Sequence, residues 1–369
     1  MTKKELGFVI SSFLIWRLGL FLILFFAIKF LPLQQHFIGG GIINYTKTPW
    51  YWAWANFDGE NYLSIAQYGY MFAAQAFFPL YPLIIKIIGS LFGGGIANFN
   101  TAGFIISNLS FVLALIGFYK LIKLDYSDKI ARITVLLLLI FPTSFYFGSV
   151  YTESIFLALV VWSFYFARRR RWFLASILGM FASATRVIGI LLLPVLAIKK
   201  RSFWLLLIPF GLMAYMIFLR QTTGDSLAFL HTLSGFGEQR SSVPILLPQV
   251  FYRYIFKILP NLNYLYFPVV FATYLEFLVG LLFLLLIIYS FGKLRIDYWI
   301  FLALGYLVPT LSGSFSSLPR YVIVLFPAFI LLALWTEKLS RPLKIVLYGI
   351  LFSSLAVASA MFLRGYWLA

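Results

Sequence analysis

Two carboxylates that lie two positions apart, Asp58 and Glu60, are the residues of this chain best suited to chemistry. Acidic side chains are scarce, because 369 residues contain only 11 Asp and Glu against 29 Lys and Arg. The pair follows the first long apolar run, and carboxylates beside a membrane are costly and usually functional. Asp-x-Glu spacing could bind a divalent cation through hard oxygen ligands. The Asp-Gly step is equally typical of a solvated turn, so the pattern alone leaves both interpretations open.

Three more charged residues interrupt apolar stretches: Glu153, Arg186 and Arg320. Glu153 suits either a functional site or the first turn of a helix, where a hydroxyl cap and a carboxylate are both favourable. A buried Arg186 needs an anion, which could be a phosphate or the carboxylate of Glu153. Arg320 ends a hydroxyl-rich segment, where it could hold a phosphate or sugar, or extend to the membrane interface.

The remaining polar signals are weaker. Arg17 and Glu276 both fall near the middle of long apolar runs, which predicts a structural ion pair rather than a proton relay. Four consecutive arginines at 168–171 are interpreted as a topology signal that contacts anionic lipid. The absence of cysteine excludes disulfides, thiol catalysis and cysteine metal sites.

The composition is that of a membrane protein built from helices. Hydrophobic residues make up 62% of the chain, aromatic residues 20%, and the mean hydropathy is +0.95. A soluble surface cannot be built from the 11% that is charged. Backbone groups in lipid must be satisfied internally, which favours helices. The net charge of +18 is assigned to residues that flank membrane helices, so no nucleic-acid partner is expected.

The apolar runs predict about eleven transmembrane helices in one membrane-embedded domain spanning 1–369. With the N-terminus inside, every predicted inner loop is basic. Two long segments then lie outside, 32–100 and 221–263, and loops of that length usually have a function. Trp50, Trp52 and Trp54 are expected in the headgroup layer, and 77–92 is predicted to be a re-entrant or interfacial helix. The predicted spans are 8–31, 101–122, 131–148, 153–167, 172–185, 187–198, 203–220, 264–291, 297–311, 320–336 and 343–363.

Five segments form an ordered set of motifs along the chain: Phe57-Asp58-Gly59-Glu60-Asn61-Tyr62 through Gly69-Tyr70, Ala76 to Pro82, Phe141-Pro142-Thr143-Ser144 through Tyr151-Thr152-Glu153-Ser154, Ala184-Thr185-Arg186 and Leu318-Pro319-Arg320-Tyr321. In this order they resemble the GPI mannosyltransferase II family of the PIG-V type. Phe57 replaces the usual Trp of the first segment, and Val187-Ile188-Gly189 replaces Ser-Asn-Gly after the fourth. The chain is also short for the eukaryotic enzymes, which suggests a prokaryotic relative.

This resemblance implies a GT-C membrane glycosyltransferase, an all-α polytopic fold with an acidic residue of the first outer loop in catalysis. It further implies a polyprenyl-phosphate sugar donor, usually mannose, and a lipid or glycolipid acceptor. The hypothesis is a single-displacement, inverting transfer with Asp58 as general base. Substrate binding is assigned to Glu60, Tyr62, Glu153, Arg186, Arg320 and Tyr321. A divalent metal is permitted by the Asp-x-Glu spacing but not required.

The site is expected on the extracytoplasmic face of the plasma membrane in a prokaryote, or of the endoplasmic reticulum in a eukaryote. Two other functions share the many spans and the charges within them. A transporter or lipid flippase would be expected to show repeats related between its halves, which the sequence lacks. A non-catalytic subunit of another membrane enzyme is the third possibility.

Overall fold

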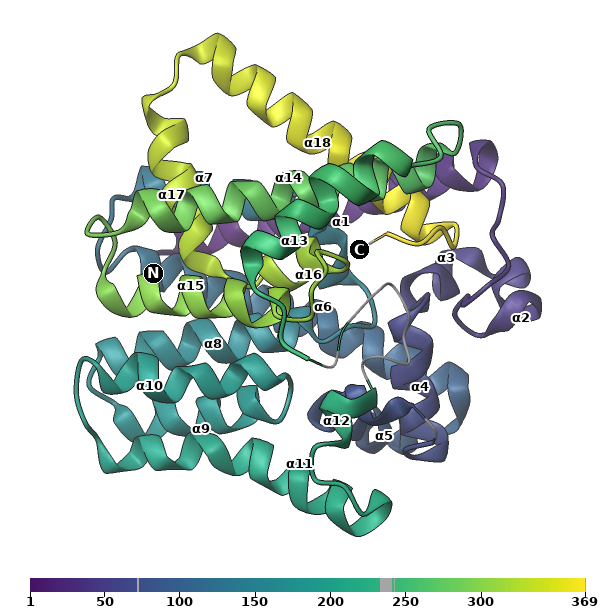
Figure 1. The fold of residues 1–369 in the computed structure, drawn as a ribbon, viewed down its shortest axis with the longest axis horizontal. Coiled ribbons are helices and arrows are strands. Elements are labelled where there is room, and N and C mark those ends of the chain that lie inside the picture. The colour runs from purple at the N-terminus through teal and green to yellow at the C-terminus, as the bar shows by residue number, and fades with distance from the viewer. Residues whose placement is uncertain (72, 233–240, 242, 369) are drawn as a thin grey trace.

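The computed structural model describes residues 1–71, 73–232, 241 and 243–368, and this part of the chain contains helices and no strands (Figure 1). Five helices are long and apolar enough to cross a membrane: α1 (Lys3–Phe30), α6 (Gly95–Ile122), the continuous η5–α11 segment (Phe203–Thr223), α14 (Phe267–Ser290) and α18 (Arg341–Leu363). Together with the fold described below, they make the chain an integral membrane protein.

The six other predicted spans also fall on helices, but on shorter pieces. These are α7 (Asp128–Ile140) with η3 (Ser144–Gly148), α8 (Glu153–Arg168), α9 (Trp172–Ser183), η4 (Val187–Leu191) with α10 (Leu192–Ala197), α15 (Ile296–Thr310), and α16 (Leu318–Val322) with α17 (Phe326–Lys338). Proline explains two of the breaks. Pro142 ends α7, because the residue before a proline avoids the helical conformation. Pro327 lies in the first turn of α17, where its missing N–H costs nothing.

The predicted first outer segment is a set of short helices rather than an open loop. It comprises α2 (Gly41–Lys47), α3 (Pro49–Trp52), η1 (Ala53–Ala55), α4 (Asp58–Tyr68), η2 (Ala74–Ala76) and α5 (Leu80–Leu91), and α2–α5 lie at the right of Figure 1. The second outer segment contains α12 (Ala228–His231), α13 (Leu247–Arg253), a π-helical turn η7 (Tyr254–Ile258) and η8 (Leu259–Asn261). Residues 233–240 and 242 of that segment lie outside the described part of the chain.

The prediction that Arg17 pairs with Glu276 is wrong. Arg17 is buried, and its guanidinium lies over the rings of Trp54 at 3.8 Å and Phe104 at 4.6 Å. Glu276 instead accepts a hydrogen bond of 2.8 Å from the Tyr254 hydroxyl. Cation–π contact with an electron-rich indole takes the place of a carboxylate. Trp54 is therefore in the core, not in the headgroup layer, and Trp52 is also buried whereas Trp50 is exposed.

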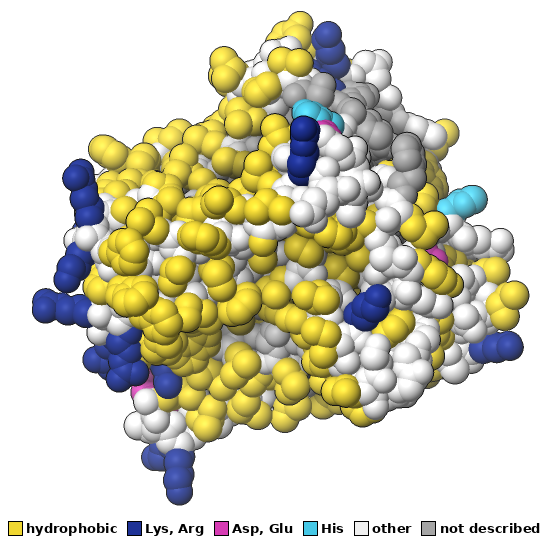
Figure 2. Space-filling model, turned by 90° about the horizontal axis from the view of Figure 1, so that it is seen from below, with side chains coloured by type: hydrophobic (Ala, Val, Ile, Leu, Met, Phe, Trp, Pro, Cys, Tyr) yellow, Lys and Arg dark blue, Asp and Glu magenta, His cyan; other side chains and the backbone are white. Residues whose placement is uncertain are grey.

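Basic side chains gather at one end of the molecule. Figure 2 shows a broad hydrophobic surface with Lys and Arg concentrated at its left edge, the end at which the N-terminus lies in Figure 1. The Arg168 guanidinium at the end of α8 binds both carboxylate oxygens of Asp125, at 2.5 and 2.7 Å. The arginine run at 168–171 is therefore partly paired within the protein.

Candidate active site

An unusual backbone turn at the start of α4 sets the position of Asp58. The preceding residue, Phe57, has a φ of +56°, which a bulky side chain adopts only when its surroundings enforce it. The Tyr151 hydroxyl secures this turn, because it accepts the Asp58 N–H at 3.2 Å and donates to the Asn56 carbonyl at 3.0 Å. The Asp-Gly step is thus the first turn of a helix and not a solvated turn.

Arg320 reaches the same place from the other end of the sequence. Its helix, α16, begins after Ser317 at a φ of +62°, and the Thr143 hydroxyl anchors it by donating to the Pro319 carbonyl at 2.8 Å. Arg320 Nη1 lies 2.5 Å from Asp58 Oδ2, and Arg320 Nε lies 3.7 Å from Glu153 Oε1. Arg320 is only 7% exposed, so it does not extend to the membrane interface.

Glu153 links the two arginines. Its Oε1 accepts a hydrogen bond of 2.8 Å from Arg186 Nη1, which is the carboxylate partner that the sequence offered as an alternative to a phosphate. Its Oε2 is buried and has no hydrogen-bond partner. The Glu153 side chain is 2% exposed and that of Arg186 12% exposed. Two carboxylates and two guanidinium groups therefore form one buried cluster whose formal charges cancel.

This charged cluster forms part of the wall of a cavity of about 950 Å³. That volume lies near the upper end of the range for sites that enclose drug-sized ligands. The remaining wall is largely apolar. The lining residues that carry the argument are Asp58, Tyr62, Glu153, Arg186, Arg320 and Tyr321 together with Phe77, Phe78, Val187, Ile188, Phe229 and Leu230.

Comparison with known proteins finds a family match over part of the chain. Residues 35–208 match the family model described as mannosyltransferase (PIG-V). The match confirms the resemblance found in the sequence, and it contains Asp58, Glu153 and Arg186 but not Arg320. No curated protein matches the chain by sequence.

The fold is shared with ArnT from Cupriavidus metallidurans. The chain aligns with its apo crystal structure at a TM-score of 0.52 and with its undecaprenyl phosphate complex at 0.53, with 16% identity in both. Both alignments cover 93% of this chain but only 62% and 63% of ArnT. At this identity the likeness shows the fold alone, and it confirms the GT-C fold class.

Within the matched residues, the two acidic residues of the first motif lie on different faces of one helix. Asp58 and Tyr62 are four positions apart on α4 and share one face, and both line the cavity. Glu60 falls on another face of the helix and is not among the lining residues. The prediction that Glu60 binds substrate therefore does not fit the cavity. Burial raises the pKa of the Glu60 carboxyl, so its ionised form is disfavoured in the folded protein.

Tyr62 combines burial with nearby negative charge. Its hydroxyl lies 3.4 Å from the Thr152 hydroxyl. Burial, and then the carboxylates of Asp58 and Glu153, raise the pKa of the Tyr62 phenol, so it stays protonated. A protonated phenol at the cavity wall can donate a hydrogen bond to a ligand oxygen.

The sequence does not predict three features of the site. Trp367, in the last few residues, lines the cavity and meets Phe57 ring to ring at 5.3 Å. Gln34 and His36, which follow α1, also line it. Tyr151 was noticed only as part of a motif, although its hydroxyl holds the turn before Asp58. Among the described residues, no three His, Cys, Asp or Glu side chains gather in a way that could hold a metal ion.

Proposed function

We propose that this protein is an inverting membrane glycosyltransferase that moves a sugar, mannose by family, from a polyprenyl-phosphate donor to a lipid-linked or glycolipid acceptor. The observation that carries the proposal is the meeting of Asp58, Arg320, Glu153 and Arg186 at the wall of one large cavity. A carboxylate suits an acceptor hydroxyl, and guanidinium groups suit a phosphate. The PIG-V family match supports the choice of mannose.

In the proposed transfer, every bond, proton and electron pair is accounted for by the donor, the acceptor and Asp58. The acceptor oxygen attacks C1 of the donor sugar and forms the new C1–O bond while the C1–O bond to phosphate breaks. The acceptor proton passes to Asp58, and the bonding electron pair leaves with the polyprenyl phosphate. Attack opposite the leaving group inverts C1. Negative charge therefore develops on the phosphate as the bond breaks, and the preorganised guanidinium groups of Arg186 and Arg320 would stabilise this charge.

Arg320 has two tasks in this scheme. In the free protein its Nη1 bonds Asp58 and its Nη2 lies 3.4 Å from the Tyr321 hydroxyl. A guanidinium has five N–H donors, so it can hold a phosphate oxygen and still orient the carboxylate. ArnT, which shares the fold, has been crystallised with undecaprenyl phosphate, which supports a polyprenyl phosphate as the donor carrier here.

The apolar wall suits the lipid part of the donor. Phe77, Phe78, Val187, Ile188 and Leu230 line the cavity that the charged cluster also lines. The isoprenoid chain would bury its surface there, with a gain of about 25 cal/mol per Å² of apolar area. Membrane lipids would surround the long apolar helices.

The site is proposed to open on the extracytoplasmic side. The charge asymmetry of the helix ends supports this orientation, because basic residues favour the cytoplasmic side and the cavity is built largely from the segments predicted to lie outside. The membrane would be the plasma membrane in a prokaryote or the endoplasmic reticulum in a eukaryote.

The test is Asp58→Asn, with Glu60→Gln as the matched control on the same helix. Purified protein is incubated with radiolabelled polyprenyl-phosphate mannose and a membrane lipid extract. We expect wild type and Glu60→Gln to transfer label to a new lipid, and Asp58→Asn to lose about 100-fold or more of the rate, because the base is gone. Near wild-type turnover by folded Asp58→Asn would refute the assignment of the base. Label that crosses a vesicle without changing its lipid would indicate a transporter.

A further inference from the structure

A second, smaller pocket lies beside the large cavity. It has a volume of about 260 Å³ and shares two lining residues with the large cavity, Tyr266 and Trp367. The segment 312–317 lies between the two spaces, since Ser312 and Ser317 line the large cavity whereas Ser314 and Ser316 line the small pocket. None of the residues to which the catalytic proposal gives a role lines the small pocket.

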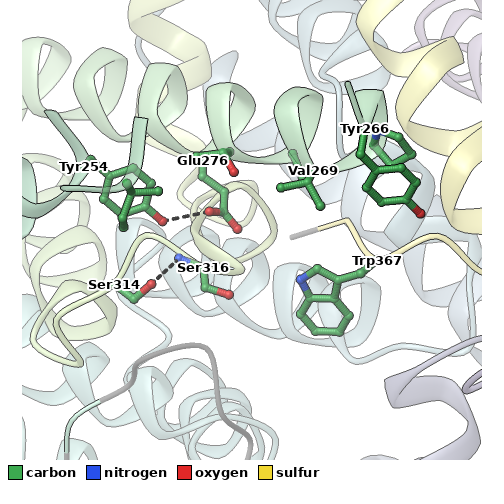
Figure 3. A pocket seen from close by; sticks show the side chains of 11 residues that line it. Tyr254, Tyr266, Val269, Glu276, Ser314, Ser316 and Trp367 are labelled. Carbon is green, nitrogen blue, oxygen red and sulfur yellow. Dashed lines mark hydrogen bonds between the residues drawn. The ribbon is translucent and has the colours of Figure 1, made fainter. Parts of the chain in front are cut away.

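The polar groups of the small pocket suit a ligand rich in hydroxyl groups. Glu276 on α14 is 7% exposed, and the Tyr254 hydroxyl holds its carboxylate at 2.8 Å. Figure 3 shows Glu276 facing the Ser314–Ser316 turn, with Trp367 and Tyr266 further along the pocket. The Ser316 hydroxyl is buried and has no hydrogen-bond partner, although its own backbone N–H is bound by Ser314 Oγ at 3.0 Å. A buried hydroxyl without a partner is costly, and a ligand oxygen would satisfy it.

The polar groups of the small pocket disfavour the lipid chain as occupant. A polyprenyl chain in this pocket would desolvate Glu276 and Ser316 without offering either a hydrogen bond. A sugar ring offers hydroxyl donors to the carboxylate and an apolar face to the rings of Trp367 or Tyr266. The pocket is also slightly smaller than the range for drug-sized ligands, about 300–1,000 Å³. Its size therefore fits a single ring.

We propose that this pocket is a saccharide subsite that binds one hexose ring of the glycolipid acceptor, beyond the ring that receives the new sugar. The identity of the ligand as the acceptor rests on the proposed function. Tyr266 and Trp367 line both spaces, so one oligosaccharide could extend from the large cavity into the small pocket. Glu276 accepts hydrogen bonds from ring hydroxyls, the Ser316 hydroxyl bonds a ring oxygen, and Trp367 packs against the ring face.

The test measures binding without turnover, so it does not depend on the transferase reaction. The probes are octyl α-mannoside and the corresponding octyl dimannoside, titrated against the purified full chain in lipid nanodiscs. The second ring is expected to tighten binding to the wild type by about ten-fold, as one or two hydrogen bonds do. We expect Glu276→Gln and Ser316→Ala each to lose most of that increment and to keep the affinity for the monosaccharide probe.

Two matched controls isolate the pocket. Asp297→Asn changes another buried carboxylate, which lines neither cavity and pairs with Arg295 at 3.2 Å. Ser290→Ala removes a buried hydroxyl at the other end of α14. Both should keep the full increment. Undecaprenyl phosphate binding should be unchanged in all four variants.

The outcomes separate the two proposals. If the second ring adds no affinity to the wild type, or if Ser316→Ala and Glu276→Gln keep the increment, the subsite is refuted whether or not the protein transfers sugar. Ser316→Ala decides the matter should Glu276→Gln fold poorly, because the Ser316 hydroxyl has no protein partner to lose. A retained increment in a protein that transfers no sugar would support the subsite and contradict the transferase.

Discussion

At the scale of single residues, the site is organised around one shared carboxylate. Glu153 contacts both Arg186 and Arg320, while the Asp58 carboxylate forms an ion pair with Arg320. Burying a charge is costly unless a partner compensates it, so each member of this cluster stabilises its neighbours. Substitutions here act on folding as well as on chemistry, so stability and ligand binding are measured separately.

Arg186→Ala should lower the free energy of unfolding by about 3 kcal/mol, since it removes the 2.8 Å partner of the buried Glu153 carboxylate and leaves only the longer 3.7 Å contact with Arg320. The double variant Arg186→Ala, Glu153→Gln should recover part of this loss, because it removes the orphaned charge as well. Thermal unfolding of the three proteins in the same detergent measures the effect. Equal unfolding temperatures for wild type and Arg186→Ala would show that the pair does not support the fold.

Arg320→Lys should weaken binding of undecaprenyl phosphate by about ten-fold. A lysine ammonium keeps the charge but cannot bond the Asp58 carboxylate and a phosphate in the planar arrangement of a guanidinium. Equilibrium binding in nanodiscs checks this, with Arg220→Lys, an exposed arginine at the end of α11, as the control. Unchanged affinity in Arg320→Lys would remove this residue from the phosphate site.

At the scale of elements, the site depends on helices that approach one another closely. Gly211 on α11 faces α9 at a distance that leaves no room for a side chain, because a Cβ at this position would lie 2.0 Å from the Met180 carbonyl oxygen. The Ser183 hydroxyl joins the same two helices by donating to the Ile208 carbonyl at 2.6 Å. The contact fixes the end of α9, from which the chain continues to Arg186.

Gly211→Ala should destabilise the protein by about 1–3 kcal/mol, because backbone atoms must move to admit the methyl group. Gly19→Ala is the matched control, since a Cβ there meets no atom within 4 Å and alanine favours a helix interior. Thermal unfolding and sugar transfer are both measured. Wild-type stability in Gly211→Ala would contradict the packing of α9 on α11.

At the scale of the whole molecule, orientation in the membrane decides where the cavity opens. The predicted topology puts the connection before α14 outside and the connection between α17 and α18 inside. The chain contains no cysteine, so a single introduced thiol gives an unambiguous label. Asn263 and Ser340 are exposed positions in these two connections.

A membrane-impermeant maleimide added to intact cells should label Asn263→Cys and leave Ser340→Cys unlabelled until the membrane is permeabilised. The physical reason is the basic bias of the inner loops, which holds that side in the cytoplasm. Labelling of Ser340→Cys but not Asn263→Cys in intact cells would invert the topology. The proposed extracytoplasmic site would then be wrong.

The sequence by itself determined the class of the protein and pointed to four charged residues that line the large cavity. Hydropathy predicts helices at every position where the structure has a long one, because apolar runs in lipid must satisfy their own backbone. The motifs named Asp58, Glu153, Arg186 and Arg320 before any contact between them was known. The predicted spans 131–148 and 320–336 nevertheless run through Pro142 and Pro327, where the structure has helix boundaries.

Only the tertiary structure decided which of these residues meet. Asp58 and Arg320 are separated by 262 positions, and nothing in the intervening sequence specifies that they form a pair. Helical geometry turned Glu60 away from Asp58, and the indole of Trp54 replaced Glu276 as the partner of Arg17. The small pocket could not be predicted from the sequence, because Glu276, Ser316 and Trp367 come from three distant segments. Pairing across such distances depends on how whole helices pack, and that is set by the shape of all their side chains together.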